Sequence, residues 1–118
     1  MSPKPIRLFL ARHGNTFNEG DKVVMVGAKT NLPLTSFGHQ QAFNLSEFLK
    51  NKGIHFDKVY CGSLLRQQET ASAISQDVIA HVAALDELDY GPWEGLTDDE
   101  IRAQWPQEFE NWDKKGIW

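Results

Sequence analysis

Short apolar runs alternate with segments of helical periodicity along this 118-residue chain, and the alternation limits the possible folds more than any other feature. Brevity and flanking breakers predict strands over residues 6–11, 56–61 and 79–85. Apolar spacing predicts helices over residues 36–52 and 64–76. This order of strand, helix, strand, helix and strand indicates an α/β domain with an at least partly parallel sheet.

Two further segments lie outside this alternation. Glycine, asparagine and proline recur through residues 14–34 and predict a long loop, and loops of this length in a domain usually carry function. Thr97 and Glu100 have the spacing of a capping box that opens a helix. Pro106 interrupts this helix, and a further helical stretch is predicted over residues 107–115.

Composition excludes several classes of protein. The balance of 12 Lys plus Arg against 16 Asp plus Glu gives a net charge of −4, which argues against a nucleic-acid binder. Cys61 is the sole cysteine, and His39, His55 and His81 lack ligand spacing, so we expect no metal and no cofactor. No run approaches the ~18 apolar residues of a membrane span, and no signal-peptide core is present. We therefore expect one cytoplasmic domain over residues 1–118 that contacts no membrane.

Polar side chains follow each predicted strand at the point where it ends. Arg12 and His13 follow the first strand. Arg66 follows the second strand, and Glu87 follows the third. Ligands of parallel sheets bind beyond the carboxyl ends of the strands, so we expect these residues to meet at one edge. Each residue alone is more typical of a structural or surface role. Together they favour phosphoryl transfer, because guanidinium groups match phosphate oxygens, imidazole is a nucleophile and a carboxylic acid can protonate a leaving oxygen.

Four segments have the spacing of known motifs and occur in the expected order. They are Arg12-His13-Gly14-Asn15-Thr16, Asn31-Leu32-Pro33-Leu34-Thr35 with Gly38 and Gln41-Ala42, Ser63-Leu64-Leu65-Arg66 with Glu69-Thr70-Ala71, and Leu85-Asp86-Glu87 through Gly91-Pro92-Trp93-Glu94-Gly95. Together they resemble the histidine phosphatase superfamily over nearly the whole chain. The resemblance implies a phosphoglycerate mutase-like, three-layer α/β/α fold with a mostly parallel sheet.

The resemblance also implies roles for individual residues. His13 would attack phosphorus to form a phosphohistidine, and Glu87 would donate a proton to the leaving oxygen. Arg12 and Arg66 would bind the phosphoryl oxygens, and Asn18 would donate to the phosphate. The expected reaction is the metal-independent hydrolysis of a phosphomonoester, with a small phosphorylated metabolite as substrate. A phosphoglycerate-type phosphomutase is an alternative.

The second active-site histidine of the family, supplied by a V-x-H-G segment, has no counterpart here. No His-Gly pair follows His13-Gly14, and His81 is the last histidine. We therefore expect an N-terminal portion of a longer enzyme, without the C-terminal part of the usual fold, and we interpret Trp118 as a point where the chain was cut. One expected consequence is an exposed sheet edge that favours a homodimer. The other is an alternative function, a catalytically impaired phosphate-binding or interaction module.

Tryptophans are concentrated in the last quarter of the chain. They are Trp93, Trp105, Trp112 and Trp118. We expect them to pack on helix faces over the sheet, and the alternative is an aromatic rim that selects the leaving group of the substrate.

Overall fold

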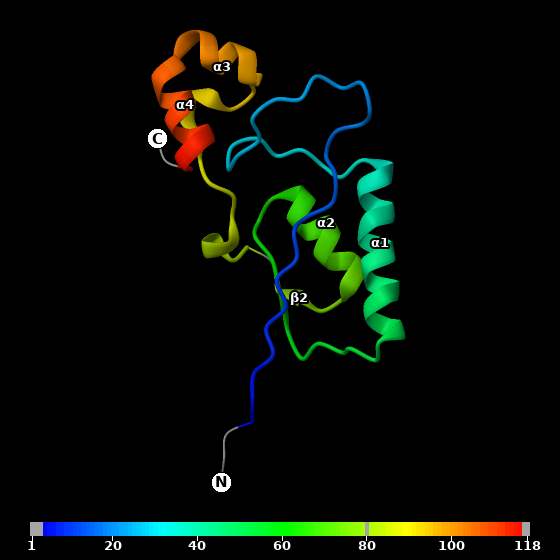
Figure 1. Ribbon diagram of the computed structural model, residues 1–118. Helices are drawn as coiled ribbons and strands as arrows, with labels where there is room; N and C mark the ends of the chain where they lie inside the picture. Colours follow the sequence, from blue (N-terminus) through cyan, green and yellow to red (C-terminus); the bar gives the residue numbers. More distant parts are fainter. Residues whose placement is uncertain (1–3, 80, 117–118) are drawn as a thin grey trace.

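The computed structural model describes residues 4–79 and 81–116, which form an α/β unit and a neighbouring helical unit (Figure 1). The α/β unit contains α1 (Ser36–Asn51), β1 (Val59–Tyr60), α2 (Leu65–Ile74), β2 (Val78–Ile79) and the 3₁₀ helix η1 (Ala83–Leu85). The helical unit contains the 3₁₀ helix η2 (Gly91–Trp93), α3 (Asp98–Gln104) and α4 (Pro106–Lys115). The radius of gyration is 17.1 Å. A compact domain of this length has about 13.5 Å, so the molecule is elongated.

Helix α1 forms as predicted, between Thr35 and Gly53. Thr35 Oγ1 accepts a hydrogen bond from the Gly38 N–H at 3.0 Å and satisfies one of the free donors at the helix start. Gly53 has a φ of +68°, a left-handed conformation that glycine adopts without penalty. Helical spacing places four buried residues along α1: Gly38, Ala42, Ser46 and Leu49. The helix packs against α2.

The sheet of the described residues consists of β1 and β2, which pair in parallel as predicted. Val59 lies opposite Val78, and Tyr60 lies opposite Ile79. The Cys61 N–H extends the ladder by donating to the Ile79 carbonyl at 3.0 Å. Helix α2 is the crossover that parallel pairing requires.

The strand predicted over residues 6–11 does not form. This segment runs past the sheet without joining β1 or β2 (Figure 1). Ile6 is 93% exposed, Leu8 79% and Leu10 87%. The prediction was wrong because it rested on local apolarity, whereas a strand also needs a neighbouring strand to pair with its backbone. No strand in the described part of the chain pairs with this segment.

The strand predicted over residues 79–85 is also shorter than expected. Its start belongs to β2, residue 80 lies outside the described residues, and its end forms η1. The Asp86 N–H closes η1 by donating to the Ala83 carbonyl at 3.1 Å. The Asp86 carboxylate accepts a hydrogen bond from the Ser63 N–H at 2.7 Å. These bonds hold the chain near the end of β1, so tertiary contacts override the local strand propensity.

The helical unit has a core of its own around Trp93. Ile101 of α3 and Phe109 of α4 bury their side chains against this indole, and Trp105 and Trp112 pack on the cluster. Trp112 lies on a helix face, as predicted, whereas Trp93 lies in η2 and Trp105 caps the junction of α3 and α4. The three side chains pack in one cluster rather than over the sheet. Trp118 lies outside the described residues.

The predicted capping box opens α3. Thr97 Oγ1 accepts a hydrogen bond from the Glu100 N–H at 3.2 Å, and Glu100 Oε1 accepts one from the Thr97 N–H at 3.1 Å. The bond from the Thr97 N–H is the largest cause that lowers the pKa of the Glu100 carboxyl. The box therefore fixes the first turn of α3.

Thr97→Ala is expected to lower the free energy of unfolding by about 1 kcal/mol, because the Glu100 N–H loses its acceptor at the helix start. Urea denaturation followed by tryptophan fluorescence measures the change. Ser72→Ala, a similar truncation at an exposed position of α2, should change this free energy by less than about 0.5 kcal/mol. Equal losses in the two variants would contradict the capping role.

Candidate active site

Gly14 fastens the loop that carries Arg12 and His13 to α1 and α2. Its N–H donates a hydrogen bond to Thr70 Oγ1 of α2 at 3.1 Å. A Cβ atom at Gly14 would lie 2.5 Å from the carbonyl oxygen of Gly38 in α1. Only glycine permits such a close approach of two backbones, so this contact sets the position of the preceding histidine.

The structure brings Arg12, His13 and Glu87 into one pocket of about 610 Å³. The long loop supplies a second part of its lining, through residues 14–17 and 23–26. Three of the five predicted site residues therefore line one pocket. They do so although the strand predicted over residues 6–11, which was expected to place Arg12 and His13, is absent.

The imidazole of His13 is oriented by its own loop. His13 Nδ1 lies 2.7 Å from the carbonyl oxygen of Gly14. A carbonyl oxygen can only accept a hydrogen bond, so Nδ1 carries the hydrogen and the neutral ring keeps its lone pair on Nε2. This tautomer leaves Nε2 as the nucleophilic atom of the ring.

Glu87 directly follows Asp86, whose carboxylate accepts the hydrogen bond from the Ser63 N–H. Its Oε1 accepts a hydrogen bond from the Leu88 N–H at 3.0 Å. Because Asp86 is bonded to Ser63 at the end of β1, the neighbouring carboxyl group is held at the pocket by the sheet. A carboxyl group in this position can exchange a proton with a bound molecule.

Arg66 is 1% exposed and does not line the pocket. Its Nη1 donates to the Thr30 carbonyl at 2.7 Å, and its Nη2 donates to the Gly27 carbonyl at 3.2 Å. Burial lowers the pKa of the guanidinium, and the carboxylates of Glu87 and Glu94 act in the opposite direction. Arg66 therefore braces the long loop and places a buried positive charge near two carboxylates.

Glu94 is a residue to which the sequence motifs assign no role. Its Oε1 accepts three hydrogen bonds from the long loop, at 3.2, 2.9 and 2.8 Å: from Gly27 N, Lys29 N and Thr30 Oγ1. Its Oε2 is buried, with no hydrogen-bond partner among the described residues. The sequence feature that could have pointed to Glu94 is its position directly after Trp93, which the structure buries. A carboxylate beside a buried side chain needs fixed hydrogen-bond donors.

Asn18 does not line the pocket. It lies in an exposed turn, where its N–H donates to Asp21 Oδ2 at 2.7 Å and its carbonyl accepts from the Asp21 N–H at 3.1 Å. The structure therefore does not bring Asn18 together with the other predicted site residues.

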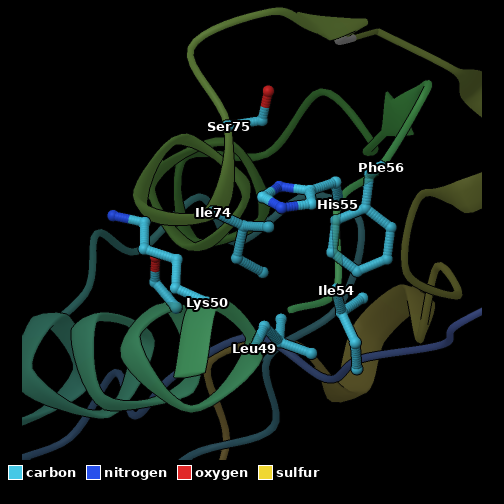
Figure 2. Close-up of a pocket in the computed structure, with 8 residues that line it drawn as sticks. Leu49, Lys50, Ile54, His55, Phe56, Ile74 and Ser75 are labelled. Atoms are coloured by element: carbon cyan, nitrogen blue, oxygen red, sulfur yellow. The ribbon is translucent and has the colours of Figure 1, made fainter. Parts of the chain in front are cut away.

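A second pocket, of about 210 Å³, lies between the ends of α1 and α2 (Figure 2). Figure 2 shows the His55 ring and the side chains of Leu49 and Ile74 around the same space. Lys50 lines it too, and its Nζ lies 3.6 Å from Glu47 Oε1. The two pockets share no lining residue, so His55 lies outside the candidate site and can serve as a control for His13.

Residues 4–79 and 81–116 contain no group of three or more His, Cys, Asp and Glu side chains placed to hold a metal ion. No helix in these ranges combines the length and apolarity that a membrane crossing needs. Burial, followed by the charge of Asp86, raises the pKa of the Cys61 thiol, so this cysteine is less readily ionised than an exposed one.

A family model described as the histidine phosphatase superfamily (branch 1) matches residues 8–117. The chain belongs to this superfamily. Its mixed α/β structure with a small parallel sheet agrees with solved structures of the phosphoglycerate mutase-like fold.

The relatives include both mutases and phosphatases. A 2,3-bisphosphoglycerate-dependent phosphoglycerate mutase of Bartonella tribocorum is 36% identical over 107 residues, which cover 86% of this chain and 51% of the relative. The adenosylcobalamin/alpha-ribazole phosphatase of Escherichia coli is 33% identical over 110 residues, with 91% and 52% covered. The crystal structure of a phosphoserine phosphatase from Entamoeba histolytica in complex with 3-phosphoglyceric acid has a TM-score of 0.69 at 28% identity, with 89% and 51% covered. The chain thus spans about half the length of these relatives.

Proposed function

We propose that this chain carries the reaction centre of a metal-independent phosphomonoesterase that works through a phosphohistidine at His13. One observation carries the proposal: Arg12, His13 and Glu87 line a single pocket, and the hydrogen bond at His13 Nδ1 leaves Nε2 as the nucleophile. The substrate is a small phosphorylated metabolite.

The reaction has two steps. His13 Nε2 forms a bond to phosphorus while the ester P–O bond breaks, and the leaving oxygen takes the proton of the Glu87 carboxylic acid. A water molecule then gives a proton to the Glu87 carboxylate as its oxygen attacks the phosphohistidine. The P–N bond breaks, and inorganic phosphate and the free imidazole are released.

The charge of the phosphoryl oxygens is offset by Arg12 at the pocket wall. The contacts of Arg66 and Asn18 with phosphate stay predictions, because two nitrogens of Arg66 hold backbone carbonyls and Asn18 lies in an exposed turn. The single incomplete domain, the cytoplasmic location and the homodimer also stay predictions.

The proposal is tested by rapid alkaline quenching during hydrolysis of p-nitrophenyl phosphate, followed by peptide mass spectrometry. We expect one phosphoryl group on the peptide that contains His13, stable to base and lost in acid, as a P–N bond requires. A chelator in the assay should leave the rate unchanged.

Other outcomes assign a different function. A phosphoryl group on another residue, or a rate that falls with chelator, contradicts the mechanism. Phosphate binding without turnover supports the phosphate-binding module instead. Transfer of the phosphoryl group to a second hydroxyl of phosphoglycerate rather than to water supports the mutase.

A further inference from the structure

Apolar and aromatic side chains form a large share of the lining of the active-site pocket. Phe17, Tyr90 and Trp112 line it together with residues 23–26, a run of valines and one methionine. Tyr90 and Trp112 are half-buried, so each ring has one side packed in the protein. A pocket that needed only to hold a phosphoryl group would not require such a wall.

Ring contacts hold Tyr90 and Trp112 in place. Tyr90 packs edge-on against Trp112, with ring centroids 6.1 Å apart and an interplanar angle of 89°. Trp112 is held from behind by Trp93 at 6.0 Å and by Phe109 at 5.9 Å, both in the core of the helical unit. Burial raises the pKa of the Tyr90 phenol, with smaller contributions from the nearby carboxylates, so the ring stays uncharged.

Few basic side chains line the pocket. Of the described residues that line it, Arg12 and His13 are the two basic ones, and the proposed reaction uses both. The lysines of the neighbouring segments are engaged elsewhere: Lys22 pairs with Glu100 at 3.4 Å, and Lys29 pairs with Asp89 at 3.5 Å. A second anionic group on the substrate would find no cation in this wall.

We propose that the site selects phosphomonoesters whose alcohol is uncharged and carries an aromatic or branched apolar group, which packs against Tyr90 and Trp112. This inference rests on the proposed function and deepens it. A carboxylated alcohol such as glycerate would lose its hydration shell without gaining a charge partner. An apolar alcohol removes its own surface and that of the rings from water.

The test compares 2-phenylethyl phosphate with 3-phosphoglycerate, since both are esters of primary alcohols. We expect kcat/KM to be at least about tenfold higher for the phenylethyl ester. Trp112→Ala should bring the ratio toward one. Phe43→Ala, a truncation of an aromatic ring exposed on α1, should leave the ratio unchanged. A ratio at or below one in the unmodified protein overturns the inference.

Trp112 also belongs to the helical core, so a second variant keeps the test independent of folding. Val23 lines the pocket and is 63% exposed, so Val23→Arg adds a cation to the wall without disturbing a core. We expect this variant to raise kcat/KM for 3-phosphoglycerate by about tenfold. Phe43→Arg adds the same charge on α1 and should not. Equal effects of the two variants would contradict selection at this wall.

Binding separates this inference from the proposed function. In 3-phenylpropylphosphonate and 2-hydroxy-4-phosphonobutanoate, a CH₂ group replaces the ester oxygen, so neither can be hydrolysed. If calorimetry shows that 3-phenylpropylphosphonate binds more tightly, but no ester is hydrolysed, the apolar specificity of the pocket is supported and the phosphatase function is refuted. If esters are hydrolysed but the two phosphonates bind equally tightly, the phosphatase function is supported and the apolar specificity of the pocket is refuted.

Discussion

His13→Ala is expected to reduce kcat for p-nitrophenyl phosphate by about 10³-fold or more, because the covalent intermediate can no longer form. Residual turnover would come from Arg12 and Glu87 acting on a bound water molecule. KM should change far less than kcat, since Arg12 still binds the phosphoryl oxygens. Steady-state kinetics measures both constants, and the quench experiment should show no phosphorylated peptide.

The matched control is His55→Ala. This imidazole is exposed and lines the second pocket, which shares no residue with the candidate site. Its loss should leave kcat and KM unchanged. If both histidine variants lose activity equally, the effect is one of folding rather than of chemistry. If His13→Ala keeps full activity, the imidazole is not the nucleophile.

Arg66→Met is expected to lower the free energy of unfolding by about 2–4 kcal/mol, because two hydrogen bonds from a buried charged donor are lost. Methionine fills much of the same volume but donates no hydrogen bond. The Thr30 and Gly27 carbonyls would then lose their donors. The carboxylates of Glu87 and Glu94 would lose the nearby positive charge.

Urea denaturation measures the global loss, and amide hydrogen exchange shows where it is felt. Amide exchange should accelerate at Gly27 and Lys29 of the long loop, whose N–H groups donate to Glu94. Arg102→Met is the control, because Arg102 is exposed and pairs with Asp99 on the surface. Its loss should cost no more than about 1 kcal/mol. Equal losses would mean that the buried guanidinium is not a structural brace.

The helices were predictable because their signals are local. Thr35, Gly53 and the Thr97–Glu100 pair act through backbone groups a few residues away, and each is found where the sequence predicts it. The boundary of α4 at Pro106 differs from its predicted start by one residue. Such contacts depend on neither the sheet nor the rest of the fold.

The strands were predictable only in part because pairing is not local. Residues 56–61 and the start of 79–85 contain strands that pair in parallel. Residues 6–11 contain more apolar side chains than residues 56–61 and nevertheless remain exposed. Apolarity and alternation show that a segment could be buried, but they do not show which backbone would pair with it.

For the candidate site, the sequence by itself determined the residue types and their order: Arg12 and His13, then Arg66, then Glu87. The tertiary structure alone decided that Arg66 donates to the Thr30 and Gly27 carbonyls. It also decided that Glu94 accepts hydrogen bonds from the same loop, and that Asn18 does not line the pocket. The physical reason is that a motif records spacing along the chain. A buried charge, in contrast, is placed by donors and acceptors that arrive from distant segments when the chain folds.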